Sequence, residues 1–327
     1  MQNFRTDVSI SSASPFAHRD KLFTIGSCFA QAIGDRLMRY KFDATVSPFG
    51  VIYNPVSIHK SLRYAVHHEP PQKHTYLENH GLHLNYDFHS SLSSVRQEDL
   101  EGMIANMIGA LHYFLASSAR VIITYGTAWV YTRKETGEIV ANCHKMPATT
   151  FAKSLLSESD IVNSFRELYA AAKKLNPALR FILTLSPVRH LRDTLELNSA
   201  GKAVVRAACH KIAEEFADAA YFPAYEIMMD DLRDYRFYKA DMIHPTEEAE
   251  GYIFEKFAQT YFDDSTRSFI CQWDAILAAI NHRAFHPGSV AHQQFLRETL
   301  KKIEAFAQRF NVDDEIRLVR SQMTGPP

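Results

Sequence analysis

The stretch LFTIGSCFAQAIGDRLMRY, residues Leu22–Tyr40, changes its hydrophobic pattern partway along. Leu22–Ile25 is a short apolar run, which is typical of a buried strand. From Cys28 onward the apolar residues recur at the spacing of one face of a helix. Gly26 and Ser27 lie where the period changes. The sequence therefore predicts a strand that turns directly into a helix, with a hydroxyl group at the turn.

The same alternation continues along the chain. Apolar, β-branched runs predict further strands, and helical periodicity predicts a helix after most of them. The predicted strands lie in segments 44–46, 120–129 (where Gly126 stops the strand), 180–190 and 220–224. The predicted helices cover 57–65, 99–115, 159–175, 199–216 and 247–262. This alternation predicts an α/β fold with a mostly parallel sheet covered by helices on both faces. Ligands of such sheets bind outside the carboxyl ends of the strands, so we expect one rim to carry Ser27, Gly50 and the segments 126–129 and 186–190.

The last part of the chain has a different pattern. Two helical segments, 268–281 and 291–310, follow one another with no predicted strand between them. The sequence thus predicts two units, an α/β domain over residues 1–262 and a helical extension over residues 263–327. The apolar stripes of the extension require burial, either against the α/β domain or in a homodimer.

Composition limits the classes of function. The chain has 327 residues, with 36 Lys and Arg against 37 Asp and Glu, and no sustained basic run. This balance argues against a nucleic-acid binder or a membrane-surface binder. No segment has the apolar length that a signal peptide or a membrane span needs. The 4 cysteines lack CxxC spacing, which is typical of reduced thiols, so we expect a cytoplasmic protein.

Ser27 has two interpretations. Serine is a good N-cap, which contributes about 1 kcal/mol relative to alanine. It is also well placed as a nucleophile, because a helix N-terminus offers free amides and positive potential to an oxyanion. A serine hydroxyl needs a base, and in DMIHP the Asp241 carboxylate can hold the Nδ1–H of His244 and leave Nε2 to face Ser27. The alternative is that Asp241 caps a turn and that His244 only precedes Pro245.

Several motifs together resemble the GSCFA-domain family, which is similar to the SGNH/GDSL hydrolases. They are GSCFA at 26–30, PFGVIYNP at 48–55, YGTAWVY at 125–131, ANCHK at 141–145, SPVRHLRD at 186–193, RDYRFY at 233–238 and DMIHP at 241–245. The resemblance extends from residue 4 to about residue 262. It implies a three-layer α/β/α sandwich, with Ser27 at the position of the nucleophile and with Asp241 and His244 at the positions of the D-x-x-H pair.

The resemblance also implies an oxyanion hole made by the serine amide, a glycine amide and an asparagine side chain. Ser27 and Gly50 match the first two positions. Ala128 stands where the asparagine is expected, so this donor must come from another position. Each candidate for it also has an explanation as a turn or capping residue. The candidates are Asn54, Asn142 and Thr127.

Other residues near the predicted rim are candidates for substrate contact. They are Arg189, His190, Tyr235 and Arg236. His190 also competes with His244 as the base. We expect Cys28 to point into the core, where a free cysteine behaves as a small hydrophobe. Cys143 and His144 lack a second ligand pair at metal-binding spacing, so no metal is expected, and the histidines of segment 67–89 are expected in a surface loop or a lid.

Three functions fit these features. The first is a serine-dependent ester hydrolase without a cofactor, acting on a small acyl ester such as an O-acetyl group on a carbohydrate. The second is an O-acyltransferase that uses the same acyl-enzyme, and the third is a non-catalytic binding module on a hydrolase fold. Ala128 favours the third function, whereas a complete set of Ser27, His244 and Asp241 argues against it.

Overall fold

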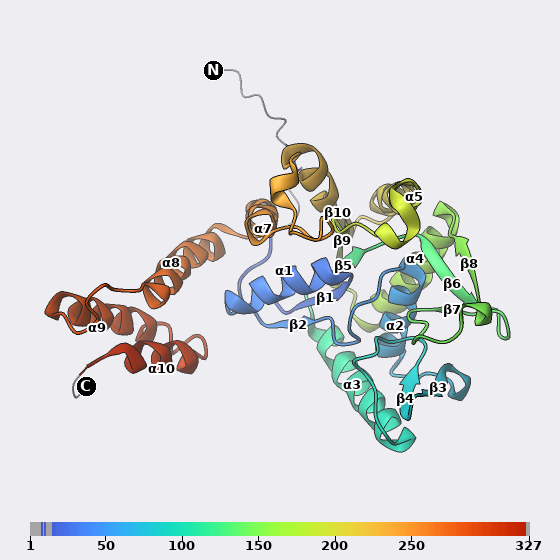
Figure 1. Cartoon of the computed structure of the whole chain (residues 1–327), viewed down its shortest axis with the longest axis horizontal. Helices are drawn as coiled ribbons and strands as arrows, with labels where there is room; N and C mark the ends of the chain where they lie inside the picture. Colours follow the sequence, from blue (N-terminus) through green and yellow to red (C-terminus); the bar gives the residue numbers. More distant parts are fainter. Residues whose placement is uncertain (1–7, 9, 11–14, 325–327) are drawn as a thin grey trace.

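Five parallel strands form the central sheet of the protein. The computed structural model describes residues 8, 10 and 15–324. The strands are β1 (Leu22–Gly26), β2 (Ala44–Val46), β5 (Arg120–Tyr125), β9 (Arg180–Leu185) and β10 (Ala219–Phe222). They lie in the order β10-β9-β5-β1-β2, and each neighbouring pair is parallel (Figure 1). The predicted fold class is confirmed.

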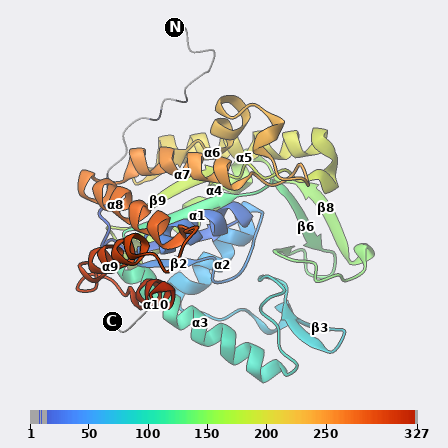
Figure 2. The same cartoon turned by 60° about the vertical axis from the view of Figure 1, so that its left-hand side comes forward.

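Helices cover both faces of this sheet (Figure 2). Successive side chains of a strand point to opposite faces, so Leu22 and Phe23 belong to two different buried clusters. The Leu22 cluster packs against α1 (Cys28–Arg39) and α7 (Glu247–Tyr261). The Phe23 cluster packs against α2 (Pro55–His67), α3 (Gln97–Ser117), α4 (Glu158–Leu175) and α5 (Thr194–Glu215). The result is the expected three-layer sandwich, with most helix ends within about three residues of the predicted ones.

Two small antiparallel sheets are attached to the sandwich. β3 (Tyr76–Asn79) and β4 (Leu82–Asn85) form a hairpin within the histidine-rich segment. β6 (Trp129–Arg133) pairs with both β7 (Ile139–Val140) and β8 (Phe151–Leu155). The prediction that Gly126 stops the strand of segment 120–129 is confirmed, because β5 ends at Tyr125, and the chain enters the second sheet at Trp129.

Three helices follow the α/β domain at the left-hand end of Figure 1, namely α8 (Asp264–Asn281), α9 (Val290–Glu304) and α10 (Asp313–Gln322). The Trp273 indole Nε1 donates a hydrogen bond to the Arg39 carbonyl at 2.9 Å, and the Tyr40 hydroxyl donates to Asp274 at 2.7 Å. The Leu22 cluster continues into these helices. The three C-terminal helices therefore pack against the end of α1. The homodimer and the boundaries of the two predicted units stay predictions. The predicted helix 291–310 ends early, at Glu304, and α10 was not predicted.

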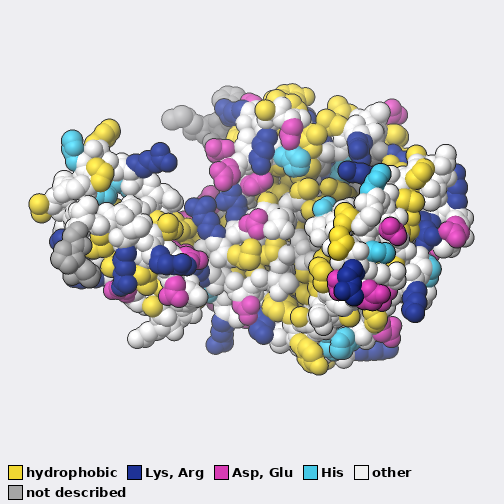
Figure 3. Space-filling model, turned by 60° about the horizontal axis from the view of Figure 1, so that its bottom comes forward, with side chains coloured by type: hydrophobic (Ala, Val, Ile, Leu, Met, Phe, Trp, Pro, Cys, Tyr) yellow, Lys and Arg dark blue, Asp and Glu magenta, His cyan; other side chains and the backbone are white. Residues whose placement is uncertain are grey.

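Charged side chains of both signs are interspersed over the face seen in Figure 3. This distribution agrees with the nearly equal numbers of basic and acidic residues, 36 and 37. Over residues 15–324, no helix combines the length and the apolar character that a membrane crossing requires.

A buried histidine joins α2 to the end of β5. His59 is fully buried, and its two ring nitrogens lie 3.0 Å from Ser164 Oγ and 2.6 Å from Tyr125 Oη. Burial lowers the pKa of His59 to about 3, whereas an exposed histidine has a pKa of about 6.5. The ring is therefore neutral in the folded protein at pH 5.

The folded protein should lose stability as the pH falls below about 6.5, because the unfolded chain then binds a proton at His59 that the folded chain does not. Between pH 7 and pH 5 this residue alone should cost about 2 kcal/mol. Urea unfolding at both pH values, for the wild type and for His59→Gln, measures it. The variant should show a pH-dependent loss that is smaller by about that amount. Equal losses in the two proteins would contradict a neutral, buried His59.

Candidate active site

The topology of the sheet places the turn after β1 at a crevice. The chain leaves β1 toward β2 on one side and returns through β5 on the other side. Gly26 pairs with Thr124, and the Ile52 amide donates to the Gly26 carbonyl at 2.9 Å. The loop between β2 and α2 therefore lies beside the carboxyl ends of β1 and β5, where open α/β sheets bind their ligands.

Ser27 is the N-cap of α1, and only 1% of its surface is exposed. Its Oγ accepts a hydrogen bond from the Phe29 amide at 3.3 Å. Its own amide donates to the Thr124 carbonyl at 3.0 Å, and its carbonyl accepts from the Ala30 amide at 2.8 Å. The capping interpretation thus describes its place in the fold, and its role as the nucleophile stays a prediction.

Asp241 and His244 form a close pair in the turn before α7. His244 Nδ1 lies 2.7 Å from Asp241 Oδ2, and the backbone amides of Ile243 and His244 donate to Asp241 Oδ1 at 2.8 and 3.0 Å. Met242 adopts a left-handed conformation with φ of 57°, which closes this tight turn. The hydrogen bonds from the His244 amide and ring, followed by that from Ile243, hold the pKa of Asp241 well below its usual value. The carboxylate therefore stays ionised and can hold the Nδ1–H of the imidazole, so that Nε2 is the free basic nitrogen.

A cavity of about 380 Å³ contains His244. One wall is a face of α1, and the other is formed by residues of the segment 239–250. Cys28 lines the α1 wall, whereas Ser27 is not among the lining residues. The structure therefore brings Cys28, rather than Ser27, into the cavity that holds the histidine.

The expectation that Cys28 points into the core was wrong. Cys28 is half-buried, and its Sγ lies 3.8 Å from the Tyr53 hydroxyl. The buried stripe of α1 contains Phe29, Ile33 and Leu37. Cys28 instead shares the i+3, i+4 and i+7 face of the helix with other cavity residues. These are Gln31, Ala32 and Asp35.

The predicted backbone donors of the oxyanion hole already have acceptors within the protein. The Gly50 amide donates to the Ser47 carbonyl at 2.8 Å, and the Thr127 amide donates to the Tyr53 carbonyl at 3.2 Å. Gly50 has φ of 73°, and a Cβ there would lie 2.4 Å from His89 Cβ, so this turn requires glycine. The amides of Ser27, Gly50 and Thr127 thus stabilise the loops around the crevice.

The predicted side-chain donors are also engaged. Asn54 caps α2, where its Oδ1 accepts from the Ser57 amide at 2.8 Å and its Nδ2 donates to Ser57 Oγ at 2.9 Å. Asn142 Nδ2 donates to Ser90 Oγ at 3.3 Å, and Ala128 is fully buried. Neither asparagine lines the cavity that contains His244. Their roles as oxyanion donors stay predictions. Asn54 Nδ2 also donates to the Val140 carbonyl at 3.4 Å, so both of its N–H groups have acceptors, whereas Asn142 Nδ2 donates one of its two to Ser90.

The predicted substrate residues are divided between two places. Arg189 and Tyr235 line a second cavity of about 210 Å³, and the Arg189 guanidinium lies 3.9 Å from the centre of the Tyr238 ring. The Arg189 side chain also donates to the Met242 carbonyl at 3.3 Å. Arg189 thus supports the turn that carries Asp241 and His244. Arg236 is not among the residues that line this cavity.

His190 lies on the predicted rim and follows Arg189, whose amide donates to the Ile243 carbonyl at 3.3 Å. Its ring contacts the Tyr53 ring edge-on at 5.1 Å, and a Cβ on Gly126 would lie 3.1 Å from His190 Nε2. The His190 amide donates to Asn198 Oδ1 at 2.9 Å. His190 therefore packs against Tyr53 near the carboxyl end of β5.

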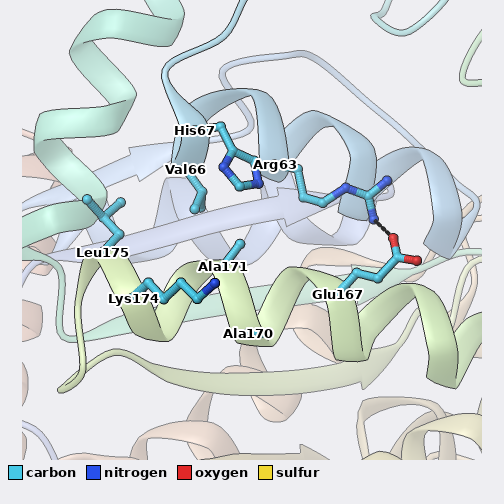
Figure 4. Close-up of a pocket in the computed structure, with 8 residues that line it drawn as sticks. All are labelled: Arg63, Val66, His67, Glu167, Ala170, Ala171, Lys174 and Leu175. Carbon is cyan, nitrogen blue, oxygen red and sulfur yellow. Dashed lines mark hydrogen bonds and ion pairs between the residues drawn. The ribbon is translucent and has the colours of Figure 1, made fainter.

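A larger cavity, about 540 Å³, lies between α2 and α4 (Figure 4). Arg63 on α2 and Glu167 on α4 form an ion pair across it at 2.9 Å. None of the predicted site residues lines this cavity. Size alone therefore does not identify the active site, since the carboxylate–histidine pair lies elsewhere.

Metal-binding side chains do not gather within residues 15–324, where no group of three or more His, Cys, Asp or Glu is placed to hold an ion. The histidine-rich segment makes local contacts instead. His74 pairs with Glu138 at 2.7 Å, and His144 lies 2.7 Å from the Asn85 carbonyl. These contacts tie the β3–β4 hairpin to the loop around β7.

Comparisons with known proteins identify the family of this chain. A carbohydrate esterase family 2 (CE2) enzyme plus carbohydrate binding domain from Corynascus thermopiles (Myceliophthora fergusii) is similar at 11% identity, with a TM-score of 0.26 over 47% of this chain and 38% of that chain. No curated protein matches. The GSCFA family matches residues 21–257, and the C-terminal domain of GSCFA domain proteins matches residues 273–325. The chain therefore belongs to the GSCFA family.

Proposed function

We propose that this protein is a hydrolase of ester bonds that acts on a small acyl ester, such as an O-acetyl group on a carbohydrate. The observation that supports it most is the contact of 2.7 Å between Asp241 and His244, because His244 lines a cavity that the start of α1 also lines. A histidine held at Nδ1 by a carboxylate is the base that acyl transfer to a side chain requires.

The cavity suits a small polar substrate. Its volume is about 380 Å³. Charged side chains of both signs lie around it, and such groups can bind the hydroxyl groups of a sugar by hydrogen bonds. They are Asp35, Arg36, Arg39, Lys239, Glu247 and Glu250.

The reaction would proceed in two steps at the turn between β1 and α1. The nucleophile gives its proton to His244 Nε2 and attacks the acyl carbon, while Asp241 stabilises the imidazolium. The negative charge on the carbonyl oxygen develops in the positive potential at the N-terminus of α1. His244 then protonates the leaving alcohol, and a water molecule activated by the same histidine releases the acyl group as a carboxylic acid.

Acetate release from p-nitrophenyl acetate and from acetylated xylan tests this function, with glucose added as an acceptor in a parallel assay. We expect catalysed release of acetate without glucose. Loss of acetyl groups from the ester that depends on glucose, and that yields acetylglucose in place of free acetate, would instead identify an acyltransferase. If neither ester loses acetate under either condition, the binding-module alternative replaces the hydrolase.

A further inference from the structure

The backbone amide and carbonyl of Ser27 are used within the fold, and its hydroxyl oxygen accepts a hydrogen bond. Its Oγ caps α1 through the Phe29 amide at 3.3 Å, and its amide extends the β1–β5 ladder to the Thr124 carbonyl at 3.0 Å. A nucleophile usually needs access to the acyl carbon, yet Ser27 is 1% exposed. Its amide cannot donate to an oxyanion without giving up the ladder bond.

Cys28 differs from Ser27 in each of these respects. Its side chain is half-buried and lines the cavity that contains His244. It is the first residue of α1, and the first amides of a helix have no intrahelical acceptor. Within residues 15–324, no hydrogen bond uses the Cys28 amide. That amide is therefore free to donate to a developing oxyanion.

His244 and Tyr53 supply the surroundings that a reactive thiol needs. Asp241 holds Nδ1 of His244 at 2.7 Å, so the nitrogen left to accept a thiol proton is Nε2. Burial, together with the neighbouring Cys28, raises the pKa of Tyr53 to about 12. The Tyr53 hydroxyl, 3.8 Å from Cys28 Sγ, therefore keeps its proton at neutral pH and can donate it to a thiolate.

We propose that Cys28 is the nucleophile of a Cys28–His244–Asp241 triad and that Ser27 is the N-cap that positions it. This inference rests on the proposed ester hydrolase. Cys28 Sγ gives its proton to His244 Nε2 and forms a C–S bond with the acyl carbon, while the carbonyl electron pair moves to oxygen. The tetrahedral intermediate collapses, the C–O bond to the alcohol breaks, and the imidazolium protonates the leaving oxygen. Water then gives a proton to His244 and attacks the thioester, and the thiolate leaves and regains its proton.

Alkylation by iodoacetamide, followed by mass spectrometry of each cysteine, tests the thiol directly. Cys271 is exposed and serves as the internal reference. A thiol activated by a histidine reacts faster than an ordinary exposed thiol, so we expect Cys28 to react about tenfold faster than Cys271 at pH 7. In His244→Ala this advantage should disappear. A Cys28 rate that is equal to or below that of Cys271, or that His244→Ala leaves unchanged, overturns the triad.

Hydrolysis of p-nitrophenyl acetate by single variants separates this inference from the proposed function. Cys28→Ala should lower kcat/KM at least about 100-fold more than Ser27→Ala does, and Cys271→Ala should match the wild type. A fluorophosphonate adduct that is lost only in Ser27→Ala, with activity lost in the same variant, makes Ser27 the nucleophile and leaves the hydrolase intact. Rapid, His244-dependent alkylation of Cys28 without ester hydrolysis supports the thiol and contradicts the hydrolase.

Discussion

His244→Ala should lower kcat/KM for p-nitrophenyl acetate by a factor on the order of 10⁴, because the variant removes the base that activates the nucleophile and protonates the leaving group. The turn should survive the change. Asp241 Oδ1 accepts from the backbone amides of Ile243 and His244, and alanine keeps both amides. Loss of activity can therefore be assigned to the imidazole.

Asp241→Asn is the complementary variant. The asparagine oxygen can still accept from the two backbone amides, but its NH₂ group would face His244 Nδ1 in place of Oδ2. The imidazole would then carry its proton on Nε2, the wrong tautomer for a base. We expect a loss on the order of 10³–10⁴ in kcat/KM, with a thermal unfolding midpoint close to that of the wild type.

A matched control exists on α5. His210 lies 3.4 Å from the Glu214 carboxylate, and 64% of its side chain is exposed. It is thus also a histidine beside a carboxylate, but it does not line the cavity. His210→Ala should leave kcat/KM unchanged. Near-normal hydrolysis in His244→Ala would show that the pair at the start of α7 is structural, whatever the identity of the nucleophile.

The parallel sheet was predictable from the sequence because its central strands are mostly apolar. Residues 120–125 and 180–185 are buried on both faces and read as continuous hydrophobic runs. The sheet of β6, β7 and β8 was not predictable in the same way. Most of β8 is exposed, so its pairing with β6 depends on contacts between distant segments rather than on a local pattern.

The contact between Asp241 and His244 was predictable from the sequence, whereas the side of α1 on which Cys28 lies was not. Asp241 and His244 were found because three-residue spacing in a tight turn brings their side chains together. Whether Ser27 or Cys28 faces the cavity depends on the residue at which α1 begins, because consecutive helix residues point in different directions. The start of a helix is uncertain by one or two residues when it is read from sequence. The polar spacing of Gln31 and Asp35 with Cys28 was the signal in the sequence that Cys28 faces outward.

The oxyanion donors could not be predicted, because a sequence does not show which amides already have acceptors. The Gly50 amide bonds to Ser47, and the Ser27 amide bonds to Thr124. Both bonds follow from how the loops lie against β1 and β5. Residue type alone identifies a potential donor, and only the folded backbone identifies a free one.

Gly26→Ala should destabilise the protein by about 3–5 kcal/mol. Gly26 has φ of 138°, which side chains rarely adopt, and a Cβ there would lie 2.0 Å from the Thr124 carbonyl oxygen. The neighbouring atom belongs to the backbone of β5, so it cannot move without breaking the bond from the Ser27 amide to the same oxygen at 3.0 Å. The change therefore strains the turn that positions both Ser27 and Cys28.

Gly102→Ala is the matched control, since a Cβ at this exposed position of α3 has no neighbour within 4 Å. Alanine in a helix is favoured over glycine, so this variant should be more stable than the wild type by about 0.5–1 kcal/mol. Soluble yield and the free energy of unfolding in urea measure both effects. If Gly26→Ala is as stable as Gly102→Ala, then β1 does not meet β5 at Thr124. The start of α1 would then lie elsewhere relative to His244, and neither Ser27 nor Cys28 would be held beside the base.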